Sequence, residues 1–337
     1  MNVYITGFDA VFPNNFELDS FSNEFDHSFT NGTINAEFNS EFTPNRSDEK
    51  IMRRDIKISV VSIRRLLKKI GLEDPEVLEK TALFVANGSF IEDTEKYMNK
   101  ISVYKNISDD LSEEEKMYKI YRASPPLLAL ETLTNSSMSF IAQYAGVKYH
   151  NTTFGTSSLS AYYALKEAIG SIKSDLNEQA IVCASNSGGG YSFLSNSAVI
   201  GYKKGWKEST AVGNIILSST KGSSLCKISM MSSGTRIPNL KDQTIRRDWS
   251  SLVPEDSEFV IFSGAFCEET NESDRLYCEN NFKYSRSLFD DYGNMGSSNL
   301  VMGIIQGIQL LNEGMPFVDI IDRDLYGRES HVRIAKC

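Results

Sequence analysis

The stretch NTTFGTSSLSAYYALKEAIG, residues 151–170, decides the fold. Polar residues lead into a tight turn at Gly155, and three hydroxyl side chains follow it, those of Thr156, Ser157 and Ser158. Hydroxyls in this place are typical of caps on the first turn of a helix. Apolar positions then recur at helical spacing as far as about residue 173. The stretch therefore predicts a loop, a tight turn and the start of a buried helix.

The flanking sequence alternates between short apolar runs and helical patterns. An amphipathic helix is predicted over residues 47–71, with Ser47 and Asp48 at its start and Gly71 at its end. A second glycine turn, at Gly293, leads into an apolar helix over residues 298–312. Alternation of this kind predicts an α/β protein whose sheet is covered on both faces. The predicted strands are residues 3–7, 81–89, 179–185, 209–220, 226–234, 258–266 and 330–337.

The two turn-and-helix units, at Gly155 and Gly293, suggest an internal duplication. We therefore predict an N-terminal half over residues 1–220 and a C-terminal half over residues 221–337, packed as one compact unit. A highly charged stretch, at about residues 93–119, is predicted to be a solvated helical insertion in the first half.

The composition excludes several classes of function. The chain has 337 residues, is 41% hydrophobic and carries a formal net charge of -9. An acidic chain is a poor general binder of nucleic acid, because phosphate contacts need clustered Lys and Arg. No apolar run reaches the ~18 residues of a membrane span. The opening residues are apolar without a basic flank, which favours a first strand over a signal peptide. We expect a cytoplasmic protein without nucleic-acid or membrane partners.

The cysteines and histidines predict neither a disulfide framework nor a metal site. The five cysteines are odd in number and widely spaced, and no pair has metal-ligand spacing. His27, His150 and His331 are scattered. We expect reduced thiols, no bound metal and no cofactor. The cysteines are Cys183, Cys226, Cys267, Cys278 and Cys337.

The order of these segments resembles the β-ketoacyl synthases of the thiolase fold over nearly the whole chain. Residues 155–169 are similar to that family's A-C-S-S-S-L-x-A-L-x-x-A stretch, and residues 3–13 to its opening strand and turn. The resemblance implies two pseudo-duplicated halves in five layers, α-β-α-β-α. The other similar stretches are RRDIKISVVSIRRLLKKIGL (53–72), GWKESTAVGNIILSS (205–219) and NEGMPF (312–317).

The catalytic positions of that family are altered in this chain. Its enzymes use a cysteine at a helix N-terminus as nucleophile, and two histidines that stabilise developing negative charge. Gly155 stands at the cysteine position, Ser263 at the first histidine, and Gly293 or Asn294 at the second. The family's closing G-F-G-G loop is LYGRE here, residues 325–329.

These losses do not depend on the alignment register. No cysteine precedes Cys183, and no histidine lies between His150 and His331. The resemblance therefore implies a non-catalytic subunit of the kind called a chain length factor. Such a subunit pairs with an active ketosynthase and limits the length of the acyl tunnel, in polyketide, aryl polyene or fatty acid synthesis. Its partners would be that ketosynthase and an acyl carrier protein.

The same resemblance identifies residues that would shape the tunnel and dock the carrier. Leu127 and Leu128 lie in a stretch that reaches toward the partner's pocket in the family. The carrier is acidic, and one predicted helix concentrates basic residues. Ordinary packing leucines and a solvated basic face remain the alternatives. The docking candidates are Arg64, Arg65, Lys68 and Lys69.

Two other classes of function remain open at this point. One is an enzyme with altered chemistry, an acyl transfer or a decarboxylation, in which Ser263, Cys267 and Asn294 replace the lost groups. A serine at the Gly155 turn would lack a histidine base. The other is a degenerate homodimeric scaffold, which would be stable without a second subunit.

Overall fold

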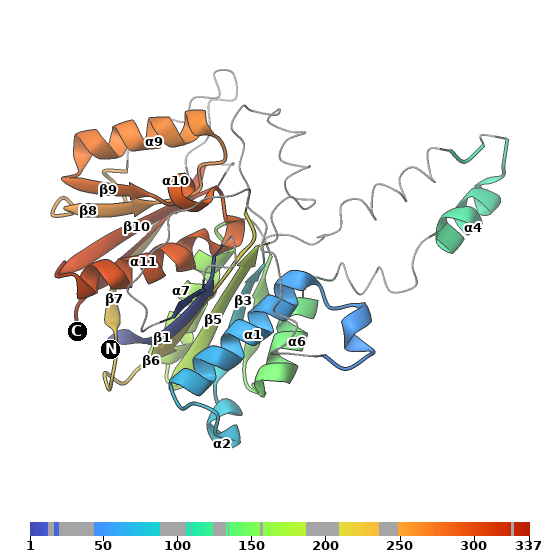
Figure 1. The fold of residues 1–337 in the computed structure, drawn as a ribbon, viewed down its shortest axis with the longest axis horizontal. Coiled ribbons are helices and arrows are strands. Elements are labelled where there is room, and N and C mark those ends of the chain that lie inside the picture. The colour runs from blue at the N-terminus through green and yellow to red at the C-terminus, as the bar shows by residue number, and fades with distance from the viewer. Residues whose placement is uncertain are drawn as a thin grey trace.

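The protein is described from a computed structural model, drawn in Figure 1. The structure describes residues 1–12, 17–19, 44–87, 106–108, 110–123, 133, 135–155, 158–186, 209–235, 249–324 and 327–337. Leu127 and Leu128, Thr156 and Ser157, and part of the LYGRE segment lie outside these residues.

Five strands of the first half form one part of the sheet, in the order β4-β3-β5-β6-β1. The pairs β3–β4 and β3–β5 are parallel, whereas β5–β6 and β6–β1 are antiparallel. A short strand, β2 (Glu17–Asp19), pairs with the end of β1. The five strands are β1 (Val3–Val11), β3 (Ala82–Asn87), β4 (Asn151–Phe154), β5 (Gln179–Asn186) and β6 (Ala211–Ser218).

The second half repeats this topology, in the order β9-β8-β10-β11-β7. The senses of pairing match position by position, with β8–β9 and β8–β10 parallel and β10–β11 and β11–β7 antiparallel. β1 and β7 join the halves through a short antiparallel contact. The repeat supports two halves, while the division at residue 220 stays a prediction. These strands are β7 (Cys226–Thr235), β8 (Phe259–Phe262), β9 (Tyr284–Ser287), β10 (Phe317–Arg323) and β11 (Arg328–Ala335).

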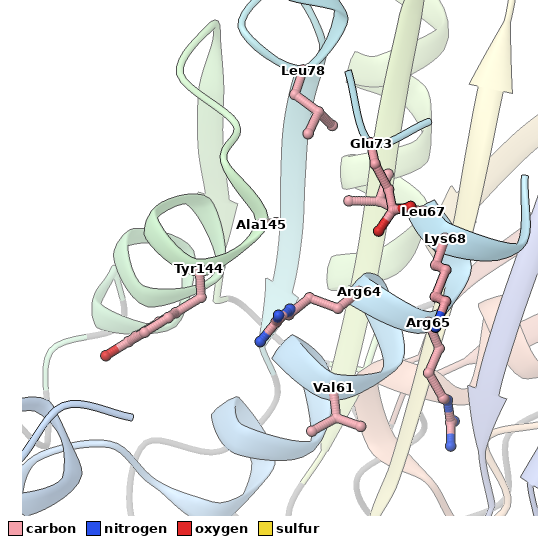
Figure 2. Close-up of a pocket in the computed structure, with 9 residues that line it drawn as sticks. All are labelled: Val61, Arg64, Arg65, Leu67, Lys68, Glu73, Leu78, Tyr144 and Ala145. Atoms are coloured by element: carbon pink, nitrogen blue, oxygen red, sulfur yellow. The ribbon is translucent and has the colours of Figure 1, made fainter. Parts of the chain in front are cut away.

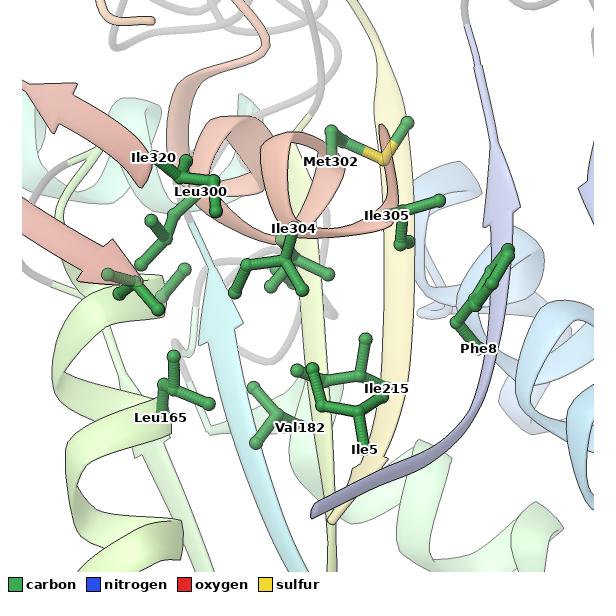
Figure 3. Packing of buried hydrophobic residues seen from close by; sticks show 14 of the residues in the cluster. Ile5, Phe8, Leu165, Val182, Ile215, Leu300, Met302, Ile304, Ile305 and Ile320 are labelled. Carbon is green, nitrogen blue, oxygen red and sulfur yellow. The ribbon is translucent and has the colours of Figure 1, made fainter. Parts of the chain in front are cut away.

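Two buried helices lie between the halves, and their packing creates the layers. α7 (Ser160–Lys173) and α11 (Asn299–Asn312) share one apolar cluster with the inner faces of both sets of strands (Figure 3). Side chains alternate along a strand, so Ala82, Phe84 and Ala86 of β3 enter this cluster while Leu83 and Val85 point outward. The predicted helix at the opening stretch is thereby confirmed, beginning at Ser160.

Separate apolar clusters cover the two outer faces. α1 (Arg54–Lys69) and α6 (Ser136–Ala145) pack on the first half, and α9 (Glu268–Asn281) packs on the second. Helix, sheet, buried helices, sheet and helix follow one another, which confirms the predicted α/β class and its five layers.

The predicted start of the first long helix was wrong. Residues Asp48–Lys50 form a separate 3₁₀ turn, η3, and α1 begins at Arg54. Asp48 accepts hydrogen bonds from Asn45 Nδ2 at 2.8 Å and from Tyr144 Oη at 2.7 Å. These bonds hold the turn against α6, so its acidic residues do not cap α1.

Several further elements were not predicted from the sequence, or only roughly placed. α9, β9 and β10 were missed. Within the charged insertion the structure describes α4 (Glu113–Ala123), apart from the sheet in Figure 1. The remaining elements are α2 (Pro75–Leu78), α10 (Leu288–Tyr292) and η4 (Gly296–Ser298). Within the described ranges no helix is long and apolar enough to cross a membrane.

Candidate functional site at the end of β10

Turns from both halves meet on the backbone of Arg323, the last residue of β10. Ser158 Oγ, in the turn that follows Gly155, donates to Arg323 O at 3.2 Å. Gly264, directly after Ser263, has φ +90°, and a Cβ there would lie 2.1 Å from the same carbonyl oxygen. The Arg323 side chain is buried and pairs with Asp274 of α9 at 2.7 Å. The structure therefore places the Gly155 turn and Ser263 around one point.

Ser263 contacts a fully buried carboxyl group, that of Asp322. Ser263 Oγ lies 2.9 Å from Asp322 Oδ1 and 3.1 Å from Ile321 O. Asp322 Oδ2 has no well-oriented hydrogen-bond donor among the described residues. A protonated Asp322 satisfies this geometry, because its O–H can donate to Ser263 Oγ while Ser263 donates to the carbonyl oxygen.

The electrostatic environment agrees with a protonated Asp322. Burial raises the pKa of this carboxyl to about 8, although hydrogen bonds such as that from Ser263 act to lower it. The nearby charge of Asp324 raises the pKa further, and the side chain of Asn299 lowers it.

Asn294 joins the same polar cluster through Asn299. Asn299 Nδ2 donates to Asn294 Oδ1 at 3.1 Å, and Asn299 Oδ1 accepts from the backbone N–H of Met295 at 2.9 Å. The backbone carbonyl of Asn294 accepts from Ser209 N–H at 2.9 Å. Gly293 has φ +76° and ψ −166°, a backbone conformation that is essentially restricted to glycine. The structure thus connects Ser263 and Asn294, two residues that the resemblance predicts to stand at altered positions, through Asp322 and Asn299.

The chemistry available to this cluster is limited to hydrogen bonding. Ser263 has a carboxylic acid and a carbonyl as neighbours and no imidazole, so nothing in the described cluster would deprotonate it. No group of His, Cys, Asp or Glu in the described ranges has an arrangement that could hold a metal ion. The cluster can orient a polar group, but it lacks the parts of a nucleophilic site.

Cys267 is a capping residue rather than a candidate nucleophile. It is fully buried at the N-cap of α9, where its side chain and that of Thr270 form a reciprocal capping box. Burial raises the pKa of the Cys183 thiol to about 12 and also raises that of Cys226. Cys337 is the exposed thiol.

We expect iodoacetamide to alkylate Cys337 of the native protein at least ~10-fold faster than any other cysteine, because the other four are buried and the reagent cannot reach them. Mass spectrometry should show one adduct in the native protein, and five after denaturation, matching the five cysteines. Rapid native labelling of Cys267 would contradict its assignment as a cap.

Two of the four predicted docking residues pair with a buried carboxylate. Arg65 and Lys69 lie over the buried Asp9 of β1, at 2.8 Å and 3.2 Å from its carboxylate oxygens. Arg64 and Lys68 are exposed. α1 starts near the carboxyl end of β1 and runs back toward α2 (Figure 1). Lys68, near the end of α1, therefore lies away from the polar cluster of Ser263, Asp322, Asn299 and Asn294. Docking of a carrier on Arg64, Arg65, Lys68 and Lys69 stays a prediction, and Arg64 and Lys68 are the more exposed pair (Figure 2).

A Ser-His-Asp sequence of contacts exists elsewhere, on the outer face of the second half. His331 Nε2 lies 2.6 Å from Asp319 Oδ1, and His331 Nδ1 lies 3.2 Å from Ser232 Oγ. Ser232 Oγ, however, donates to Leu252 O at 3.0 Å, so its hydrogen is committed to a carbonyl and not to the imidazole. This network braces β7, β10 and β11 and does not activate the serine.

Asp322 is the site residue that sequence reasoning missed. Its signal is the segment FVDIIDR, residues 317–323, in which two aspartates interrupt an apolar run. Carboxyl groups are almost never fully buried unless they are paired. An aspartate inside a predicted buried strand would have indicated a specific polar partner.

Comparisons with known proteins show which fold this chain shares with solved structures. No family model matches the chain, and no curated protein does. Among solved structures, the ishigamide ketosynthase/chain length factor is similar with a TM-score of 0.73 and 12% identity, over 100% of this chain and 99% of that one. A type II polyketide synthase acyl-carrier protein in complex with its ketosynthase bound to the hexaketide gives 0.72 and 13%, over 100% and 99%.

A β-ketoacyl synthase from Burkholderia phymatum is also similar, with a TM-score of 0.69 and 10% identity, over 100% of this chain and 99% of that one. Identities this low carry the fold and not the activity. The repeated topology, the two buried helices and these full-length superpositions agree: the chain has the thiolase-like fold of the β-ketoacyl synthases.

Proposed function

We propose that this protein is a chain length factor, a non-catalytic subunit that pairs with an active ketosynthase. The observation that carries the proposal is a chain that keeps the fold but has no cysteine before Cys183 and no histidine between His150 and His331. By the resemblance, Gly155 stands after β4 at the nucleophile position, Ser263 at the first histidine position, and Gly293 or Asn294 at the second. A glycine offers no nucleophile, and the neighbouring cluster offers no base.

Retention of the fold has a physical reason under this proposal. Partnering subunits need a matching surface, and a growing acyl chain needs an apolar pocket of defined length. The bulk of a wall residue sets where the chain stops, since overpacking costs about 1–3 kcal/mol. Leu127 and Leu128 are the proposed wall residues. The similarity to a ketosynthase/chain length factor supports this function at the level of the fold.

An acyl carrier protein is the second proposed partner. One similar structure is a carrier protein bound to its ketosynthase, which supports a carrier as partner without locating its surface here. Arg64, Arg65, Lys68 and Lys69 remain the docking candidates of the basic helix.

An enzyme with altered chemistry is the alternative that the structure keeps open. The buried cluster of Ser263, Asp322, Asn299 and Asn294 favours it, since buried hydrogen-bonding groups could orient a thioester carbonyl. The absence of an activated nucleophile in the described cluster counts against a covalent acyl-enzyme.

Native mass spectrometry after co-expression tests the proposal. The chain would be produced alone and with a ketosynthase encoded beside it in the genome, then incubated with an acyl-thioester label. We expect a one-to-one heterodimer with label only on the ketosynthase cysteine, and no label when that cysteine is changed to alanine. A stable homodimer that ignores the ketosynthase would support a scaffold instead. Label on this chain would support the altered enzyme.

A further inference from the structure

The helix α4 presents a large apolar face to solvent. Tyr121 and Met117 are the most exposed large hydrophobic side chains among the described residues, at 79% and 67%, and Tyr118 is 59% exposed. Successive helical residues are rotated by about 100°, so these three side chains lie within one sector of ~100°. The helix lies apart from the sheet (Figure 1), and the face takes no part in the described apolar clusters. A contiguous exposed apolar face of this kind marks an interaction surface.

An acidic and a basic side chain stand at the two ends of this face. Glu114 lies four residues before Tyr118, Arg122 lies four residues after it, and both are exposed. At 1.5 Å per residue, each lies about 6 Å along the helix axis from Tyr118. The face therefore carries an acid, an apolar centre and a base in chain order, and the two charges are placed symmetrically about Tyr118.

These two charges are available to a partner. Glu113 pairs with Lys116 inside the helix at 2.9 Å, whereas Glu114 makes no ion pair with any residue that the structure describes. The Arg122 guanidinium lies over the ring of Tyr118, 5.6 Å from its centroid, and keeps its donors toward solvent. A carboxylate brought to this end of the face would therefore meet an exposed cation.

A second copy of the same helix is complementary to this face when it runs antiparallel. If the two helices cross at Tyr118, Glu114 of each copy lies beside Arg122 of the other, and the apolar side chains face one another between them. A parallel pair would instead oppose like charges at both ends. The antiparallel pair also sets the helix dipoles in the favourable sense. Its two-fold symmetry closes the contact, so the pair does not extend into a filament.

We propose that α4 is a self-association surface, which pairs antiparallel about Tyr118 with α4 of a second copy of this chain. The helix has 11 residues and is about 16 Å long, so the contact is smaller than the ~1,000 Å² of a stable interface. The association is therefore weak and depends on concentration. It is independent of the proposed heterodimer: where both form, two heterodimers join through their α4 helices.

Sedimentation velocity of the full chain over a range of concentrations tests the proposal. We expect a monomer–dimer equilibrium for the wild type. Glu114→Arg sets two arginines against each other, and Arg122→Glu sets two glutamates against each other, in each case at both ends of the pair. Each variant should therefore raise the Kd of the dimer at least ~10-fold.

An equimolar mixture of the two single variants identifies the antiparallel pairing. One chain then carries arginine at both ends of the face and the other carries glutamate at both ends, so both contacts of a mixed pair are attractive. The mixture should associate at least ~10-fold more tightly than either variant alone. A fluorescent label on one of the two chains reports the mixed dimer.

Two further variants serve as controls. Met117→Lys combined with Tyr121→Lys removes the apolar face and should abolish self-association. Glu167→Arg makes the same charge change at an exposed position of α7 and should leave the Kd unchanged. Circular dichroism checks that each variant is folded. The heterodimer experiment, repeated with the double lysine variant, separates a failure of this proposal from a failure of the proposed function.

Three outcomes would overturn the proposal. The wild type could stay monomeric at every concentration, a dimer could form that the α4 variants do not weaken, or the mixture could associate no better than its components. If the chain stayed monomeric and the double lysine variant lost the ketosynthase heterodimer, the ketosynthase would cover α4 in place of a second copy.

Discussion

Replacing Gly264 by alanine is expected to lower the free energy of unfolding by about 3–5 kcal/mol. Its φ of +90° disfavours any residue with a Cβ, and that Cβ would lie 2.1 Å from the backbone oxygen of Arg323. A backbone oxygen cannot rotate away as a side chain can. The substitution must therefore separate β8 from the end of β10, at the point where the Ser263 cluster is assembled.

Urea unfolding followed by circular dichroism measures this effect, and two other glycines provide matched controls. Gly71 has φ +67°, and no atom lies within 4 Å of the place that a Cβ would take, so Gly71→Ala carries backbone strain alone, about 1–2 kcal/mol. Gly170 lies in α7 with open space around it, and Gly170→Ala should be neutral or stabilising by up to about 1 kcal/mol. Equal losses at Gly264 and Gly71 would mean that the contact with Arg323 is not tight.

The parts of the fold that were predicted from sequence are those with an uninterrupted apolar signal. β3 and β5 are buried on both faces and read as continuous apolar runs, and α7 and α11 show clear helical spacing after a glycine turn. Burial alone determines these elements, so a pattern of hydrophobic residues is enough to find them.

The elements that were missed depend on tertiary partners. β10 is interrupted by Asp319 and Asp322, whose carboxyl groups are accommodated by residues from other elements. α9 is polar along most of its length, and the buried pair between its Asp274 and Arg323 becomes visible only when both elements are placed. A single sequence does not show which residues of other elements will contact these side chains.

The candidate site, like the fold, was predicted only in part from the sequence. The residues alone show that no cysteine precedes Cys183 and that no histidine lies between His150 and His331. The loss of a nucleophile and of two catalytic histidines, which the resemblance infers from this, stays a prediction. The connection of Ser263 to Asn294 through Asp322 and Asn299 could not be predicted from the sequence, because separate segments of the chain supply these side chains. The separation of Arg65 and Lys69 from the exposed Arg64 and Lys68 also required the position of Asp9.

Asp322→Asn is expected to stabilise the protein, by an amount that grows with pH. The folded state keeps the Asp322 proton up to a pKa of about 8, whereas the unfolded chain releases it near the ordinary value of 3.8. Between these values the folded state holds more protons, so wild-type stability falls as the pH rises. Each pH unit in this window costs about 1.4 kcal/mol, which sums to several kcal/mol. Asparagine has no proton to lose, so the variant avoids this loss.

Urea unfolding of both proteins from pH 4 to pH 9 measures the difference, and Asp319→Asn is a control of opposite sign. Burial acts to raise the pKa of Asp319, but hydrogen bonds from His331, Arg333 and Ser257 outweigh it and hold the pKa below its ordinary value. Asp319 therefore contributes stability above the ordinary pKa that is lost as the pH falls. Asp319→Asn should therefore destabilise the protein by a nearly constant amount from pH 4 to pH 9, because the window in which the loss shrinks lies below the ordinary pKa of 3.8. If Asp322→Asn instead gave a pH-independent change, Asp322 would be ionised in the fold, and its contact with Ser263 would be an ordinary hydrogen bond to a carboxylate.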